Sequence, residues 1–254
     1  MPDIYAATTD GVVYHDQNDA AVASDGWALC RNSVTGSSVS NTSVYSTAGV
    51  YVKKWDADQF TIRRSFFAFD ISGVGSSDSN CAAAATLKIY GRTYGTADII
   101  AVKAHTSWAG LLTGIATNDF NALDGWNASF TSSDLTAYSA EVTTWSTSGY
   151  NDITLNDSAL SDMNSSSGVF RVAIMEYDHD YSSVEYNPGA GGEVAAGMYY
   201  NHASSAANGK RPYITYTEGS CGYSHSISGV DFGNIGSVIG VAAANIANRS
   251  GVDT

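Results

Sequence analysis

The chain has 254 residues, a length that suits one large domain plus an appendage, and its 25 acidic against 12 basic residues give a formal net charge of −13. Binding to phosphates requires clustered Lys and Arg, and the basic residues are scattered along this sequence, so we expect no nucleic-acid partner. No apolar run approaches the roughly 20 residues that span a bilayer, so we expect no membrane insertion.

Residue usage favours β-structure. Of the acidic residues 20 are Asp and only 5 are Glu, Lys numbers 5 and Gly 25, and Ser, Thr, Tyr and Val are abundant. Good helix formers are therefore scarce, whereas residues that favour strands and turns are plentiful. The composition predicts an all-β fold of short strands joined by polar turns.

The N-terminus and the cysteines bear on location and redox state. The first twenty residues show neither the basic nor the apolar region of a signal peptide, so we expect export by another route or release by lysis. Cys30, Cys81 and Cys221 form an odd set without C-x-x-C spacing, which indicates no zinc site and allows at most one internal disulfide. Cys81, which precedes four alanines, is expected to be a small buried thiol.

The first sixty residues carry weak strand signals. Short β-prone pieces at 3–7 and 11–14 precede a polar stretch, 16–47, that predicts long surface loops with one or two strands. Residues 50–55 alternate between apolar and polar and predict a strand. Trp27 and Trp55 are expected to pack in the core or at an edge rather than to bind a ligand.

Residues 61–72 form the most apolar strand candidate. Its apolar side chains divide between the two faces of an extended chain, with Phe67, Phe69 and Ile71 on one and Ile62, Phe66 and Ala68 on the other. A strand that is apolar on both faces needs cover on both sides, which predicts a central strand in a sheet stacked on a second sheet. Arg63, Arg64 and Asp70 should mark where this strand approaches water or an ion pair.

The rest of the first 217 residues repeats this strand-and-turn pattern. Strand candidates follow at 85–90, 99–104, 150–156, 168–177, 197–200 and 212–217, and 168–177 is again apolar on both faces. Residues 108–131 are expected to hold the only helical turns apart from a short helix at 158–163, with Asp157 as its N-cap. Eight or more strands at irregular spacing predict a jelly-roll β-sandwich.

Several of these features follow one another in a recognisable order. Arg64-Ser65 and Phe69-Asp70 come first, then residues 85–90, then Trp145 with residues 149–156, and finally residues 211–216. In this order, over roughly residues 3–217, the chain resembles DNRLRE-type jelly-roll domains, which are similar to carbohydrate-binding modules and occur on bacterial surface proteins and phage structural proteins. The matched positions are mostly core strand residues, so the resemblance implies a fold and assigns no ligand-binding residue.

A different regularity begins after residue 217. Gly-Val pairs recur every eleven residues and Asn-Ile pairs keep the same interval, at Gly229-Val230, Asn234-Ile235, Gly240-Val241, Asn245-Ile246 and Gly251-Val252. An eleven-residue period can accompany a right-handed helical coil, but the repeated glycine and the β-branched residues favour extended segments. We therefore divide the chain into a sandwich domain (1–217), a linker (218–226) and a C-terminal repeat tail (227–254).

The tail is too short to build a core of its own and too apolar for ordinary disorder, so we expect it to dock against another surface. A neighbouring copy is favoured because a sandwich offers unpaired strand edges and a groove between its sheets, and docking on its own domain is the alternative. The predicted assembly residues are Val230, Phe232, Ile235, Val238, Ile239, Val241, Ile246 and Val252.

Motifs that indicate catalysis are missing from the sequence. There is no nucleophile elbow, P-loop, H-E-x-x-H or dinucleotide fingerprint, and five histidines are dispersed among predicted turns. The densest polar cluster is Glu176, Asp178, His179 and Asp180, whose carboxylates could hold calcium or flank a glycosidic bond. Because the cluster follows a predicted central strand, where polar loop residues are common, a structural role is the favoured interpretation, and no cofactor is expected apart from calcium at Asp178 and Asp180.

Two functions follow from these expectations, and neither is enzymatic. The favoured one is a structural subunit of an extracellular filament or phage virion appendage, which assembles with copies of itself head to tail through the tail. The alternative is a glycan-binding adhesive module of a phage or cell surface, whose exposed tyrosines would stack on sugar rings.

Overall fold

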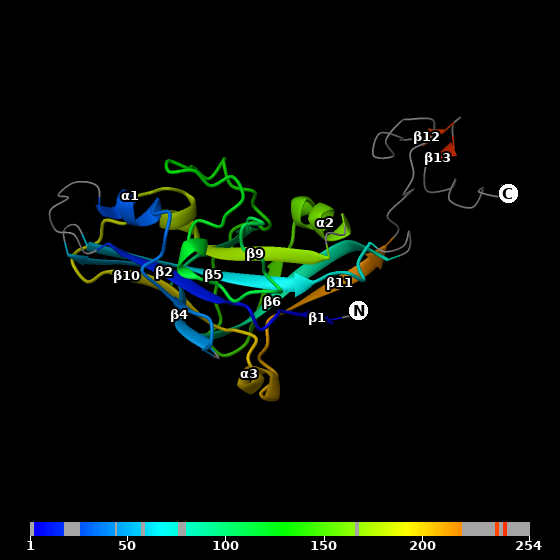
Figure 1. The fold of residues 1–254 in the computed structure, drawn as a ribbon, viewed down its shortest axis with the longest axis horizontal. Helices are drawn as coiled ribbons and strands as arrows, with labels where there is room; N and C mark the ends of the chain where they lie inside the picture. The colour runs from blue at the N-terminus through cyan, green and yellow to red at the C-terminus, as the bar shows by residue number, and fades with distance from the viewer. Residues whose placement is uncertain are drawn as a thin grey trace.

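The computed structural model describes residues 3–17, 26–43, 45–56, 59–75, 80–165, 168–219, 237–238 and 241–242. In this part of the chain the protein is an antiparallel β-sandwich, which confirms the all-β prediction (Figure 1). The strands of its main sheet are β1 (Asp3–Tyr5), β2 (Gly11–Gln17), β3 (Ser38–Ser40), β4 (Tyr45–Asp56), β5 (Gln59–Asp70), β6 (Cys81–Gly95), β7 (Ile99–Lys103), β8 (Tyr150–Thr154), β9 (Val169–Glu176), β10 (Glu193–Tyr199) and β11 (Tyr213–Gly219).

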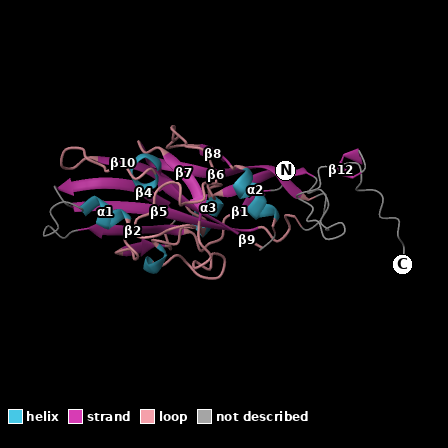
Figure 2. Ribbon diagram, turned by 90° about the horizontal axis from the view of Figure 1, so that it is seen from above, coloured by secondary structure: helices cyan, strands magenta, loops and turns pink. Residues whose placement is uncertain are grey.

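The helical elements are short. They are α1 (Gly26–Arg31), α2 (Asp157–Asn164) and α3 (Ala203–Ala207), with a 3₁₀ turn η1 (Thr117–Asp119) and a π-helical turn η2 (Tyr177–Tyr181). Figure 2 shows the long strands running along the long axis of the molecule, with α1 at one end and α2 toward the other. None of the helices in the ranges given above is long and apolar enough to cross a membrane.

Strand β5 is central, as predicted. It pairs with β2 along one edge and with β4 and then β9 along the other, and β9 in turn pairs with β7. The long strand β6 joins the two layers, because its first part pairs with β11 and β8 whereas its last part pairs with β10. The predicted second central strand is β9, which has a neighbour on both sides.

The two faces of β5 lie in two different cores. Phe67, Phe69 and Ile71 pack between the layers with side chains of β6, β8 and β11, whereas Ile62, Phe66 and Ala68 belong to a second core. This division follows the predicted alternation. The cover of the second core differs from the expectation of another sheet, since it is built by α1 and residues 104–135, with Trp27, Trp108, Phe120 and Phe130 inserted.

Several local predictions need correction. Helices α1 and α3 were not predicted, so the segment 108–131, which holds only η1, does not contain all the other helical turns. Helix α2 lies where it was predicted, but its N-cap is Asn156, whose side chain accepts a hydrogen bond from the Ala159 N–H at 3.1 Å. Asp157 is instead the first helical residue, where its charge suits the helix dipole.

The cysteines and tryptophans also have defined surroundings. Cys81 is disulfide-bonded, which corrects the expectation of a buried thiol, whereas Cys30 is a buried free thiol. Trp27 is buried in the second core. Trp55 is instead exposed near the end of β4, where its indole N–H donates to Thr61 at 2.9 Å, so the expectation of packing is met for Trp27 alone.

Candidate functional site

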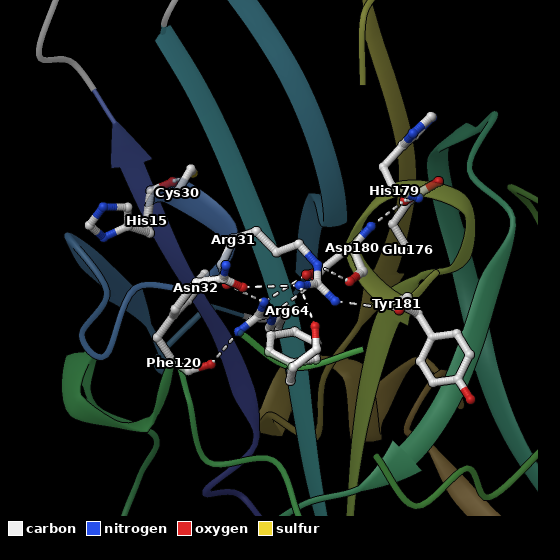
Figure 3. Close-up of polar contacts among 11 residues, drawn as sticks. His15, Cys30, Arg31, Asn32, Arg64, Phe120, Glu176, His179, Asp180 and Tyr181 are labelled. Atoms are coloured by element: carbon white, nitrogen blue, oxygen red, sulfur yellow. Dashed lines mark hydrogen bonds and ion pairs between the residues drawn. The ribbon is translucent and has the colours of Figure 1, made fainter. Parts of the chain in front are cut away.

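A buried ion pair links β5 to η2 (Figure 3). The Arg64 guanidinium donates to both carboxylate oxygens of Asp180, from Nε at 2.8 Å and from Nη2 at 2.6 Å. It also donates to the backbone carbonyls of Phe120 and Arg31, each at 2.8 Å. Of the two alternatives expected on this strand, water or an ion pair, Arg64 has the ion pair, and each acceptor oxygen comes from a segment distant in sequence.

A second arginine lies beside this pair. Arg31, at the end of α1, donates to the carbonyls of Asp180 at 2.6 Å and Phe130 at 2.9 Å, and its guanidinium lies 3.6 Å from the centre of the Phe130 ring. Burial lowers the pKa of Arg31 to about 10, with a smaller contribution from Arg64, so Arg31 stays charged at neutral pH. One carboxylate thus balances two guanidinium groups, and backbone carbonyls together with the Asn32 side-chain oxygen, 3.0 Å from Arg31 Nη1, supply the remaining acceptors.

This cluster is structural. Arg31, Arg64 and Asp180 are each at most 1% exposed, so no ligand reaches them while the surrounding segments stay packed. Together they connect α1, β5 and η2 with the loop residues that carry Phe120 and Phe130. Such a network fixes the relative positions of these elements rather than performing chemistry.

Glu176 organises the turn that carries Asp180. Its carboxylate accepts hydrogen bonds from the backbone N–H groups of Asp178 at 3.2 Å, His179 at 2.6 Å and Asp180 at 3.0 Å. Burial raises the pKa of Glu176 to about 8, and the charges of Asp180 and Asp178 act in the same direction, against the lowering by the amides. Glu176 is therefore the N-cap of the π-helical turn.

In this turn, most carboxylate oxygens that could bind calcium already accept hydrogen bonds. Glu176, Asp178 and His179 bring ligand atoms within 4.8 Å of one another, but the Glu176 oxygens already accept three amide N–H groups. Both carboxylate oxygens of Asp180 face Arg64, so a cation held by Asp178 and Asp180 would have to displace that guanidinium. Because Glu176 and Asp180 are buried, the same carboxylates do not flank a substrate cleft.

A continuous row of tyrosine rings crosses the outer face of the layer that contains β6, β8 and β11. Successive ring centres are 5.5, 5.6, 5.2, 5.1 and 5.6 Å apart. We call this row the tyrosine stripe; in spatial order it consists of Tyr45, Tyr199, Tyr90, Tyr150, Tyr213 and Tyr5. It therefore draws on six different strands.

Strand alternation and one bulge position the stripe. Leu87, Ile89 and Ile214 point into the core, so their neighbours Tyr90 and Tyr213 project from the opposite face. In β10 the register shifts at Gly197, where an added Cβ would lie 1.8 Å from the Arg92 carbonyl oxygen, so only glycine fits. After this bulge Tyr199 pairs with Tyr45.

Three basic side chains lie among these rings. The Arg92 guanidinium lies 3.3 Å from the centre of the Tyr45 ring and donates to the Tyr199 hydroxyl at 2.8 Å. The Lys210 ammonium lies within 5 Å of the Tyr90 and Tyr199 ring centres, at 4.9 and 4.8 Å. Arg211 lies 3.9 Å from the Tyr5 ring. The fold therefore gathers basic residues that the sequence analysis took to be scattered.

Hydrogen bonds hold this arrangement. The Tyr150 hydroxyl donates to the carbonyls of Gly209 at 2.7 Å and Arg211 at 3.1 Å, which fixes the loop that carries Lys210. Burial raises the pKa of Tyr199, but the hydrogen bonds and charges of Arg92 and Lys210 outweigh it, so the pKa of Tyr199 is lowered. Cations and phenols in this region thus form one interacting unit.

The stripe offers aromatic surface and polar groups together. Tyr5 and Tyr45 at its two ends are 42% and 37% exposed, Tyr90, Tyr150 and Tyr213 are half-buried, and Tyr199 is buried. Aromatic rings with hydroxyls and cations at their edges can pack against the C–H groups of a sugar ring and hydrogen-bond its hydroxyls. The arrangement therefore suits binding of an extended ligand rather than catalysis.

Sequence reasoning did not single out these tyrosines. The available signal was the alternation Lys88, Tyr90, Arg92 on one strand, with apolar Leu87 directly before it and Ile89 within it. That pattern places basic and aromatic side chains on one face, but it does not reveal which strands lie beside it. The pairing of β6 with β8, β10 and β11 is what completes the stripe.

The predicted assembly residues of the tail lie almost entirely outside the residues that the structure describes. For Val238 and Val241 only the backbone is described, in β12 (Ser237–Val238) and β13 (Val241–Ala242), which pair antiparallel with Val238 opposite Val241. These short strands agree with the extended segments predicted there. The role of the tail in assembly stays a prediction.

Comparison with known proteins adds no family. No protein-family model matches the chain, and no curated protein is similar enough to be counted as a relative. The resemblance to DNRLRE-type jelly-roll domains accordingly stays a prediction from the sequence.

Proposed function

We propose that the sandwich is a non-catalytic glycan-binding module, displayed on an extracellular or virion structure. The tyrosine stripe carries this proposal, because six rings in contact and three cations form an elongated recognition surface on an otherwise acidic protein. The polar cluster that best suited catalysis in the sequence is buried and committed to an arginine pair. Binding rather than turnover is therefore the activity that the geometry supports best.

Two further observations support a location outside the cytoplasm. Cys81 is disulfide-bonded, and disulfides persist in oxidising surroundings such as the cell exterior or a virion surface. The resemblance to DNRLRE-type domains points to the same setting, as bacterial surface and phage structural proteins carry them. A net charge of −13 would keep such a displayed protein from associating non-specifically.

Replacing Tyr90 by Ala is expected to weaken glycan binding by about tenfold or more, as truncation of a central aromatic contact does in other interfaces. Tyr90 is the most informative choice because it contacts Tyr150, Tyr199 and Lys210. The measurement is a titration of soluble neutral and acidic polysaccharides followed by calorimetry, with the acidic ligands repeated at high salt to weigh the contribution of the cations.

Trp55→Ala is the matched control for this experiment. Trp55 is also an exposed aromatic with a cation over its ring, Lys53 at 3.5 Å, but it lies outside the stripe. Equal losses in Tyr90→Ala and Trp55→Ala, or no binding by the wild-type chain to any polysaccharide, would count against the proposal. Turnover of a glycan that disappears on changing Asp178 or Asp180 would contradict the non-catalytic part.

A second candidate function is head-to-tail self-assembly into a filament or virion appendage. The eleven-residue repeat favours it, because a periodic apolar tail after a complete sandwich has no evident use within the domain. In addition, parts of two successive repeats form the paired strands β12 and β13. Because donor and acceptor would be different surfaces, the contact would be heterologous and would produce a ring or an open filament.

Deleting residues 227–254 is expected to convert the assembled protein to monomers. Burial of five aliphatic side chains at about 1.5–3 kcal/mol each gives a gross gain on the order of 10 kcal/mol before ordering costs, and the deletion removes all of it. Light scattering and electron microscopy of the full chain and of residues 1–226 measure the change. Identical assemblies from both chains would rule out the tail as the connector.

A further inference from the structure

The chain leaves the sandwich at one end of its long axis, and an apolar groove lies at the other. Strand β11 ends at Gly219 at the end opposite α1 (Figure 1), and α1 occupies the same far end in the perpendicular view of Figure 2. After Gly219 the sequence continues for 35 residues, 220–254. The point where the tail begins and the α1 end of the molecule are therefore separated by the length of the sandwich.

The groove at the α1 end has an apolar lining. Ala28, Leu29, Val34 and Ala128 contribute its apolar surface, and His15 and Asn32 are among its polar members. Leu29 and Val34 are 44% and 58% exposed, so two of the aliphatic side chains that line the groove are accessible to solvent. We call this surface the α1 groove.

The described lining of the α1 groove is uncharged on a strongly acidic protein. Among the residues that the structure describes there, none is Asp, Glu, Lys or Arg, although the chain carries a net charge of −13. Copies of an acidic protein repel one another wherever carboxylates face each other. A neutral, apolar segment of another copy can therefore approach the groove without electrostatic repulsion between carboxylates.

The repeat tail supplies such a segment. Residues 232–248 contain no charged side chain and include Phe232, Ile235, Val238, Ile239, Val241 and Ile246. We propose that residues 232–248 of one copy bind in the α1 groove of the next copy, so that the groove is the acceptor of a head-to-tail assembly. This inference rests on the second candidate function, head-to-tail self-assembly, and identifies the surface that would accept the tail.

A neighbouring copy suits the geometry better than the same copy. When sandwiches stack end to end, the end at which β11 stops in one copy faces the α1 end of the next, and the tail has only the junction to cross. To reach its own groove the tail would run back along the whole sandwich, which orders more of the chain for the same contact. The heterologous contact therefore costs less ordering and repeats without closure.

The test places carboxylates in the groove of the full chain. The double variant Leu29→Asp with Val34→Asp is expected to remain monomeric under conditions in which the wild type assembles, as followed by light scattering and electron microscopy. Leu112→Asp is the matched control, because Leu112 is an 86% exposed aliphatic that does not line the groove. Circular dichroism shows whether the aspartate variant folds. If it does not, the milder double variant Leu29→Ser with Val34→Ser takes its place.

A labelled synthetic peptide of residues 232–248 gives a second readout. Its affinity for the full chain, measured by fluorescence anisotropy, is expected to fall by about tenfold or more in the groove variants and to stay unchanged in Leu112→Asp. Excess peptide should also dissolve the wild-type assembly by competing for the groove.

The outcomes distinguish failure of the α1 groove as acceptor from failure of self-assembly itself. Assembly of the groove variants to the wild-type extent, with unchanged peptide affinity, would overturn the α1 groove as acceptor while self-assembly itself stood. A wild-type chain that is monomeric at high concentration would overturn self-assembly and the inference together. If that monomer protected its tail from protease and the groove variants did not, the groove would hold the tail of its own copy, which contradicts the neighbour-to-neighbour contact.

Discussion

Replacing Asp180 by Ala is expected to lower the free energy of unfolding by about 3–5 kcal/mol, because it leaves a fully buried guanidinium without its counter-charge. Arg64 donates two hydrogen bonds to this carboxylate, and Arg31 contacts the backbone carbonyl of the same residue. The change removes both side-chain hydrogen bonds of Arg64 and the negative charge near Arg31, which keeps its hydrogen bond to the backbone carbonyl, so the attachment of η2 to β5 loosens. Urea denaturation of the wild type and the variant, analysed at constant m-value, measures the loss.

An exposed ion pair serves as the control. Lys88 and Asp152 lie 2.6 Å apart on the outer face of the sandwich, and the Asp152 side chain is largely exposed. Asp152→Ala is expected to cost at most about 1 kcal/mol, since water replaces the lost partner. If Asp180→Ala were no more destabilising than Asp152→Ala, the buried cluster would not stabilise the contacts of α1 and η2 with β5.

The alternation of β5 shows how far sequence reasoning reaches. The division of its apolar side chains between two faces depends only on the strand period, and both sets were found in cores on opposite sides. The nature of the second cover could not be predicted in this way, because α1 has six residues and weak propensity. It forms where Trp27 and Cys30 are buried against β2 and β5, so tertiary packing rather than local preference determines it.

The buried ion pair marks a second limit. The sequence placed Arg63, Arg64 and Asp70 where this strand meets water or an ion pair, and it did not say which of the two surrounds Arg64. Its partner is 116 positions away in sequence, at the end of a different strand, and other acidic residues would have satisfied the same expectation. The sequence indicated Asp178 and Asp180 as candidate calcium ligands. The ion pair of Asp180 with Arg64 depends instead on how the strands pair, which the sequence does not show.

The tyrosine stripe was missed for a related reason. Sixteen tyrosines occur in the chain, and each strand contributes no more than one to the stripe, so no local sequence window contains the pattern. Only the order of the strands, together with the bulge at Gly197, turns separate residues into a continuous surface. Recognition surfaces that run across strands are in general less visible in sequence than cores, which repeat along strands.

The two proposed surfaces are compatible in one assembly. The tyrosine stripe and the α1 groove share no residue, so end-to-end contacts would leave a stripe available on every copy. Repeated weak sites on one filament raise the effective concentration of each further site once the first is bound. A long polysaccharide would then be held far more firmly by the assembly than by the monomer, even with modest affinity at each stripe.

Stability is expected to fall as the pH rises from about 5 to about 8, and the buried carboxyl of Glu176 is one cause. Burial raises the pKa of Glu176 to about 8 in the folded chain, above its ordinary value of 4.5. A group with a raised folded pKa favours folding in its protonated form, so its contribution is complete below the unfolded pKa and is lost as the pH passes the folded pKa. At about 1.4 kcal/mol for each pKa unit, the ceiling of this loss is about 5 kcal/mol.

Thermal or urea unfolding between pH 5 and pH 8 tests this expectation with two variants. Glu176→Gln cannot ionise, so the fall in stability over this range should become smaller, although not zero, because burial also raises the pKa values of Asp10 and Asp119. Asp70→Asn is the control: a hydrogen bond from the Ser72 amide lowers the pKa of Asp70, so its contribution is lost only in acid, below this range. A Glu176→Gln slope equal to that of the wild type would show that another group governs the pH dependence, and that Glu176 is ionised in its buried turn.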